Sequence, residues 1–255
     1  MACQSGVPDA GGGGVIPKSL LWRTFWRTYL VGAVYTMRGL QNVGMVFILH
    51  PVLCALYAHD PAALQRARHR YLGLYNTHPC WTPALAGLFL SLEERIARGL
   101  LTPQALTTVR STVVFTLSGL GDAFFGGGVF VLWALVQCFL LVRGLWAWAV
   151  VWTVTALIAV QVMKVLTFFR AYSRGLAFLQ DLKRWNLINW ARHIKVVCAV
   201  ALAAVWAALA APLGPWAVLV LGAGVGVAGV LAPSGPWRLV VLAGVGVAWI
   251  VGQWA

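Results

Sequence analysis

Residues 145–163 read LWAWAVVWTVTALIAVQVM, a run without a charged side chain. As an α-helix this run would extend about 28 Å, which is close to the roughly 30 Å thickness of a bilayer's hydrocarbon core. Trp146, Trp148 and Trp152 lie near one end of the run, where tryptophans usually meet the membrane–water interface. The run therefore predicts a membrane-spanning helix.

The composition of the whole chain agrees with a membrane protein. Of its 255 residues 61% are hydrophobic, whereas soluble domains are about half apolar, and the mean hydropathy is +0.82. Nineteen Lys and Arg against six Asp and Glu give a formal net charge of +13. Because the basic residues fall between apolar segments, we expect them in cytoplasmic loops and beside anionic lipid headgroups, not on nucleic acid. The predicted fold class is all-α, a polytopic helical bundle.

The N-terminal part divides into a tail and an arm. Residues 1–17 are mostly polar and glycine-rich, and we expect a disordered tail that places the N-terminus in the cytoplasm. Residues 18–255 would form one membrane domain, in which 18–57 holds an amphipathic arm and the first helices. The arm's aromatic and cationic faces are typical of a helix in the membrane interface, or alternatively of one that packs on a partner. Those faces comprise Trp22, Phe25, Trp26, Tyr29, Arg23 and Arg27.

A polar core is predicted over residues 58–142. Asp60 and Pro61 are typical of an N-cap and a first helical position, so we expect a helix over 61–73. A polar turn follows over 76–79. The next helix is expected over 83–99, with Gly99 as its C-cap.

The segment 113–142 is almost uncharged but is interrupted by glycines between 119 and 128. Each glycine destabilises a helix by about 1 kcal/mol relative to alanine. We therefore expect a broken or re-entrant segment here, before a helix over 129–142.

The C-terminal half alternates between apolar and basic segments. After the transmembrane helix over 143–163, the segment 164–195 holds seven Lys and Arg against Asp181 alone, and we expect a cytoplasmic loop with helical stretches. Apolar segments over 196–211, 216–232 and 237–254 predict C-terminal transmembrane helices in 196–255.

Three acidic residues are candidates for substrate binding. Asp122 lies inside an apolar segment, where an ionisable group is expensive and usually functional; the alternative is that it caps a half-helix. Glu93 has apolar helical neighbours and should be buried, so it needs a ligand or a basic partner such as Arg95, Arg98 or Arg110. Glu94 could bind substrate or pair with Arg98 at i,i+4 spacing.

Three polar residues complete the candidate set. Asn76 and Gln41 offer amide donors and acceptors that suit sugar hydroxyls, and His78 lies in the same turn as Asn76. The alternatives are a helix-breaking turn for Asn76 and His78, and an interhelical hydrogen bond for Gln41.

No arrangement typical of catalysis is present. The sequence shows no metal-ligand spacing, no nucleophile–base arrangement and no phosphate loop or dinucleotide fingerprint, so we expect no catalytic residue, metal or cofactor. An alternative is a membrane-embedded hydrolase that uses Glu93, Asp122 and His78.

Several motifs, in order over about residues 20–195, resemble the IID component of mannose/fructose/sorbose-type sugar phosphotransferase systems (PTS). They are Gln41-Asn42-Val43-Gly44 with Pro51 and Leu56-Tyr57, Arg70-Tyr71 with Asn76-Thr77-His78-Pro79, Leu92-Glu93-Glu94, Arg110 with Gly119-Leu120-Gly121-Asp122, and Tyr172-Ser173-Arg174-Gly175. The chain departs from the family's pattern at Tyr71, Gly73, Phe115, Thr116 and Gly126.

The resemblance implies a multi-pass subunit of the bacterial cytoplasmic (inner) membrane. Such a subunit pairs with a IIC membrane subunit, as an oligomer of IIC–IID pairs, and together they bind and translocate a hexose-type sugar. Soluble IIA and IIB phosphocarriers hold the phosphoryl group, and IIB phosphorylates the sugar on entry, so this chain is not an enzyme alone. The basic segments 66–70 and 164–195 would face IIB. A non-transporting scaffold of the same fold is a further alternative.

Overall fold

The computed structural model describes residues 16–214, 216 and 222–223. Nearly all of the predicted tail over 1–17 and most of the predicted helices over 216–232 and 237–254 lie outside this range. The described residues are mostly helical and contain no strand, which confirms the all-α prediction.

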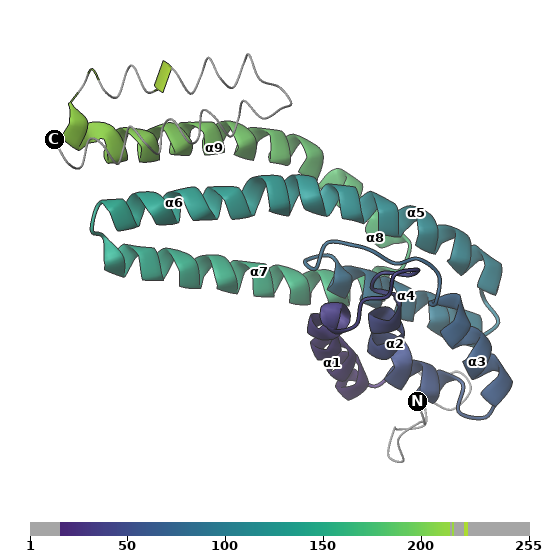
Figure 1. Cartoon of the computed structure of the whole chain (residues 1–255). Helices are drawn as coiled ribbons and strands as arrows, with labels where there is room; N and C mark the ends of the chain where they lie inside the picture. The colour runs from purple at the N-terminus through teal and green to yellow at the C-terminus, as the bar shows by residue number, and fades with distance from the viewer. Residues whose placement is uncertain (1–15, 215, 217–221, 224–255) are drawn as a thin grey trace. The chain divides into compact units, whose positions relative to one another are not determined.

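The helices follow one another through short connections (Figure 1). Their bounds are α1 Lys18–Arg27, η2 Thr28–Ala33, α2 Asn42–Leu56, α3 Pro61–Arg70, α4 Thr82–Ala97, α5 Pro103–Gly121, η3 Asp122–Val129, α6 Phe130–Val142, α7 Trp146–Arg174, α8 Ala177–Arg184, α9 Leu187–Ala210 and η4 Ala211–Leu213.

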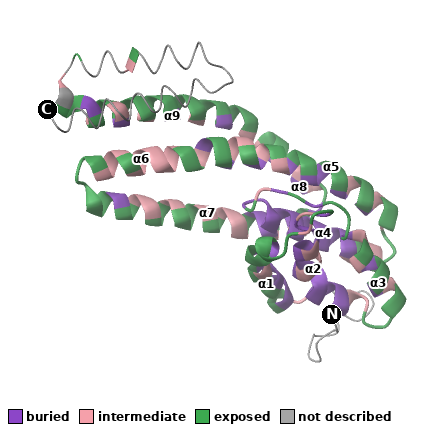
Figure 2. Ribbon diagram, viewed as in Figure 1, coloured by how far each residue is buried: buried purple, intermediate pink, exposed green. Residues whose placement is uncertain are grey.

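The chain forms two compact units. The first comprises the described residues up to Phe130 together with Val154–His193, and it holds the main core, the purple region around α2 and α4 in Figure 2. Phe25, Trp81, Phe89 and Phe168 are fully buried there. The second unit comprises Val131–Thr153 and the described residues after His193. In it Thr153 Oγ1 donates to Gln137 Oε1 at 3.1 Å, which joins α7 to α6.

Three helices in the described part of the chain are long and apolar enough to cross a membrane: Pro103–Val142, Trp146–Arg174 and Ala177–Ala210. The helix Trp146–Arg174 contains nearly all of the helix predicted over 145–163 and continues eleven residues beyond it. Few side chains in the most apolar stretch of each helix are buried inside the chain, as expected for helices that face lipid or another subunit.

One prediction about this region is wrong. Residues 113–142 do not form a re-entrant segment, because α5, η3 and α6 make one continuous helix. The glycine-rich part, Asp122–Val129, changes to π-helical hydrogen bonding instead of breaking. A π-helical turn accommodates an irregular sequence while keeping the backbone paired, which an apolar environment requires.

The basic segment 164–195 is more helical than the sequence predicts. The end of α7, then α8 and the start of α9 cover it, separated by turns at Gly175 and Asn186 with φ of 54° and 51°. Lys and Arg are good helix formers, and α7 and α8 each pack on the core, through Phe168 and Phe178 respectively.

Local signals in the polar core act as predicted. Asp60 Oδ1 accepts a hydrogen bond from the Ala63 backbone N–H at 2.8 Å, so α3 has its expected N-cap. Gly99 ends α4 with φ of 72°. The loop between α3 and α4 runs beside the loop between η2 and α2: the Gln41 N–H donates to Tyr75 O at 2.9 Å, and the Tyr75 N–H donates to Gly39 O at 3.2 Å.

Candidate functional site

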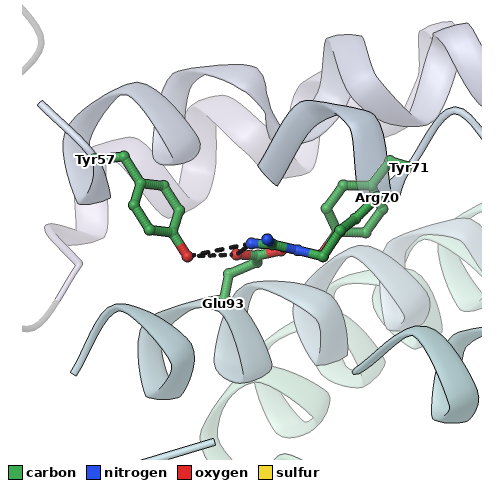
Figure 3. A network of polar contacts seen from close by, with 4 residues as sticks. All are labelled: Tyr57, Arg70, Tyr71 and Glu93. Carbon is green, nitrogen blue, oxygen red and sulfur yellow. Dashed lines mark hydrogen bonds and ion pairs between the residues drawn. The ribbon is translucent and has the colours of Figure 1, made fainter. Parts of the chain in front are cut away.

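The carboxylate of Glu93 is fully buried at the centre of a polar network (Figure 3). Arg70 donates from Nε to Oε1 at 3.1 Å and from Nη2 to Oε2 at 2.6 Å. The hydroxyls of Tyr71 and Tyr57 donate to Oε1 at 2.9 Å and to Oε2 at 2.8 Å. These four hydrogen bonds occupy the roughly four lone-pair sites of a carboxylate.

The network joins the ends of three helices. Tyr57 follows α2, Arg70 ends α3, and Glu93 projects from α4. Burial and the neighbouring Glu93 carboxylate raise the pKa of both Tyr57 and Tyr71, so these phenols stay protonated and donate. The basic partner of Glu93 is thus Arg70, and not Arg95, Arg98 or Arg110 as the sequence alternatives had it.

Gln41 is buried beside the polar turn over 76–79. Its Nε2 donates to the Tyr35 hydroxyl at 2.6 Å, and its Oε1 accepts from the Thr77 backbone N–H at 3.5 Å. A cavity of about 200 Å³ adjoins it, and Gln41, Tyr29, Tyr35 and Lys164 are among the residues that line it. Such a mixture of amide, phenol and ammonium groups is suited to hydrogen bonding with several hydroxyls.

His78 lies in the same turn, against the π-helical segment. Its ring stacks on Phe125, with centroids 5.3 Å apart, and Nδ1 accepts from the Cys80 backbone N–H at 3.3 Å. An accepting Nδ1 requires the neutral ring with its proton on Nε2. Burial lowers the pKa of His78; the nearby Asp122 carboxylate opposes this shift, and Lys164 adds to it.

The remaining predicted residues lie at more exposed positions. Asn76 and Asp122 are exposed. Glu94 forms an ion pair with Arg98, as its spacing predicts, and also accepts a hydrogen bond from the Tyr172 hydroxyl at 2.7 Å.

The structure therefore separates the six predicted residues. Asn76 and His78 share one turn, Gln41 bonds to that turn through Thr77, and Asp122 lies close enough to His78 to influence its charge. Glu93 and Glu94, on α4, make their contacts elsewhere: Glu93 with Arg70 and two tyrosines, and Glu94 with Arg98 and Tyr172.

Sequence reasoning missed Tyr35, Lys164 and the role of Arg70. Lys164 carried a signal, since it is the first charge after the apolar run 145–163. Arg70 carried one too, because it directly precedes Tyr71 at a predicted helix end. Tyr35 carried none.

Comparison with known proteins identifies the family. The family model described as the PTS system mannose/fructose/sorbose family IID component matches residues 15–223, well over half of the chain. The chain belongs to this IID family. The match covers both units and every predicted site residue.

Individual relatives of this IID chain match over shorter stretches. The mannose-specific EIID component of Escherichia coli K12 is 29% identical over 106 residues, which are 41% of this chain and 38% of that protein. The fructose permease IID component of Bacillus subtilis 168 is 24% identical over 115 residues, 45% of this chain and 42% of that protein. The chain thus aligns with about two fifths of the length of these curated relatives.

Two solved structures share the fold. One, titled a structure of a membrane protein, gives a TM-score of 0.66 at 22% identity and covers 73% of this chain and 70% of its own. The other is a cryo-EM structure of the mannose transporter ManYZ in complex with microcin E492. It gives a TM-score of 0.53 at 22% identity and covers 74% of this chain and 70% of its own.

Proposed function

We propose that this IID chain is the membrane subunit of a sugar phosphotransferase transporter. With a IIC subunit it would bind a hexose-type sugar of the mannose, fructose, sorbose or amino-sugar class and pass it inward, where IIB phosphorylates it. Family membership and three apolar helices long enough to span a membrane support this proposal. The mannose and fructose named for its relatives support the sugar class.

The single observation that carries the site is the small cavity beside the turn over 76–79. Gln41, Lys164 and Pro79 of the turn line this cavity. His78 lies in the same turn, and Asp122 of η3 is close enough to influence its pKa. We propose that Gln41, Asn76, His78 and Asp122 contact sugar hydroxyls there when the IIC subunit is present. Sugar hydroxyls suit these side chains because a hydroxyl both donates and accepts hydrogen bonds, and so can replace the water that each side chain would otherwise bind.

Glu93 and Glu94 stay in the proposed substrate-binding set, each with a competing structural role. A sugar that contacts Glu93 must displace one of its four hydrogen bonds. The same saturation disfavours a hydrolase that uses Glu93, because neither His78 nor Asp122 is among its partners and its lone pairs are occupied.

The proposed partners on the cytoplasmic side are the soluble carriers IIA and IIB. Arg170 and Arg174 both pair with Asp181, so part of their charge is neutralised within the chain. Lys183 and Arg184 form no ion pair among the described residues, and they give the basic surface its free positive charge. We expect Lys183→Glu to weaken IIB binding, and unchanged binding would contradict this assignment.

The decisive experiment measures sugar uptake and sugar-phosphate formation in cells that hold the complete system. Asn76→Ala, Asp122→Asn and Glu93→Gln are compared with Gln104→Ala, which changes an exposed polar residue on α5. We expect all three variants to lose activity, Asn76→Ala and Asp122→Asn at normal membrane levels, and the control to keep it. If all three keep full uptake, the site assignment is wrong. Binding to IIC and IIB without any uptake by the unaltered chain would favour the scaffold alternative.

A further inference from the structure

A second, larger groove lies away from the proposed sugar site, in the first unit. It has a volume of about 1090 Å³ and runs between the start of α1 and the second half of α7. Its walls are mainly apolar, and Trp22 and Leu166 within it are 41% and 63% exposed. None of the residues that line the groove belongs to the proposed sugar-binding set.

The groove has a chemical gradient along α7. Ala159, Val162 and Leu166 line one part, whereas Arg170 and Arg174 line the other. Lys18 of α1 also lines the groove, two residues after Ile16, whose backbone hydrogen-bonds to Tyr172 between the two arginines. At 1.5 Å per residue, the stretch from Ala159 to Arg174 extends about 22 Å. One leaflet with its headgroups is about as thick, half of roughly 40–45 Å.

The basic end of the groove is held in place. Arg170 Nε and Arg174 Nε lie 3.0 and 2.9 Å from Oδ2 of the buried Asp181, yet both arginine side chains remain about half exposed. Two guanidinium groups on one carboxylate leave an excess of one positive charge. Lys18 is exposed and forms no ion pair within the described residues, so it adds a second.

We propose that this groove binds one anionic phospholipid, with its acyl chains along α7 and its phosphate at Lys18, Arg170 and Arg174. Arginines that are already oriented by Asp181 still offer their outer N–H groups, which suit phosphate oxygens. A free phosphate ion would leave the apolar part of the groove empty. An anionic lipid satisfies the charged and the apolar parts together, at the depth where such a headgroup lies.

The test measures binding of phosphatidylglycerol and of phosphatidylcholine to the full chain, purified in detergent with its copurifying subunits and without IIA or IIB. Native mass spectrometry counts the bound lipids during titration. We expect one phosphatidylglycerol to bind more tightly than phosphatidylcholine. Equal binding of the two lipids would overturn the proposal.

Variants locate the site. Lys18→Glu reverses a charge at the first residue of α1, where an acidic residue suits the helix dipole, so folding should be kept. We expect it to weaken phosphatidylglycerol binding about thirtyfold, since one attraction is replaced by one repulsion.

Ala159→Trp should weaken the binding of both lipids, because the larger side chain fills the apolar part of the groove. The control, Lys183→Glu, reverses a basic residue outside the groove and should change neither. Equal effects of Lys18→Glu and Lys183→Glu would overturn the proposal.

A photo-crosslinker in place of Leu166, used in cells, distinguishes lipid from protein. Adducts with phospholipid support the proposal. Adducts confined to another protein subunit would show that a partner covers the groove and would overturn it. Because these measurements need no sugar transport, they are independent of the proposed function.

Discussion

Arg70 and Glu93 form a two-point ion pair in the interior of the first unit. The Glu93 side chain is 0% exposed and that of Arg70 is 12% exposed, and two N–H groups of the guanidinium meet the two carboxylate oxygens. The pair joins α3 to α4, and Tyr57 and Tyr71 complete it (Figure 3). The sequence predicts a need for a partner at Glu93, and the structure supplies it from the preceding helix.

The first prediction separates a structural role of Glu93 from a role in sugar binding. Glu93→Gln leaves the partly buried Arg70 without its counter-charge, and breaking an ion pair in a protein interior costs about 3–5 kcal/mol. We expect a large fall in the thermal unfolding temperature of the purified protein. Glu94→Gln, at a less buried pair, should cost less than about 1 kcal/mol.

The double variant Arg70→Met/Glu93→Gln resolves the two roles. It removes both charges while an amide remains to accept from the tyrosines, so stability should recover relative to Glu93→Gln. Uptake that returns with stability would show that Glu93 is structural. Uptake that stays lost in a stable double variant would assign Glu93 to the sugar.

The second prediction concerns Gln41 as the link between two loops. Gln41→Ala leaves the Thr77 N–H and the Tyr35 hydroxyl without this partner, which costs about 1–3 kcal/mol where the groups are buried. The turn that bears Asn76 and His78 would lose its support, so we expect weaker sugar uptake as well as a lower unfolding temperature. Gln104→Ala, at an exposed position, should change neither. Normal uptake by Gln41→Ala would contradict its place in the site.

The third prediction compares two helical glycines. A Cβ on Gly87 would lie 2.2 Å from the backbone oxygen of Phe168, so this glycine allows close approach of α4 and α7. We expect Gly87→Ala to destabilise the protein by about 1–3 kcal/mol through overpacking. Gly119 on α5 faces open space, so Gly119→Ala should stabilise by up to about 1 kcal/mol through helix propensity. Thermal unfolding of both variants in detergent tests this pair, and equal effects would show that α4 and α7 are not closely packed there.

The fourth prediction is a pH dependence from His78. Burial lowers its pKa from the ordinary 6.5, against the opposing charge of Asp122. At a pH between the lowered pKa of the folded chain and the ordinary pKa of 6.5, the unfolded chain binds the proton and the folded chain does not. The contribution of neutral His78 to stability is therefore complete above about pH 6.5 and falls as the pH decreases below that value. Unfolding temperatures at pH 7.5 and 5.5 should therefore differ more for the unaltered protein than for His78→Gln. A difference of the same size in both would exclude His78 as a source.

Local and periodic signals account for what the sequence could predict. The N-cap Asp60, the C-terminal Gly99 and the Glu94–Arg98 spacing each depend on neighbours within four residues, and all three appear in the structure. The continuous helix through the glycines at 119–128 could not be predicted from propensity, because surroundings that lack water favour backbone pairing over the intrinsic cost of glycine. The partner of Glu93 could not be predicted either, since Arg70 is 23 residues away and meets it only through helix packing.

The fifth prediction is a gain of stability at Gly73. Arg110 on α5 is buried. Among the residues that the structure describes, its Nη1 has no hydrogen-bond partner and its Nη2 meets only Leu74 O, at 3.5 Å. A Cβ on Gly73 would lie 2.4 Å from Nη2, the flexible end of that side chain. Gly73 is not among the glycines with positive φ, so its backbone accepts a side chain without that strain.

Gly73→Asp would therefore give the Arg110 guanidinium a carboxylate partner and reduce the freedom of the unfolded chain. We expect stabilisation of about 1–2 kcal/mol, measured by thermal unfolding of the purified protein. Gly73→Asn has the same size without the charge and should gain less than half of this. If the aspartate and asparagine variants unfold at the same temperature, Arg110 does not lack a counter-charge, and its buried position is explained by packing and the Leu74 carbonyl alone.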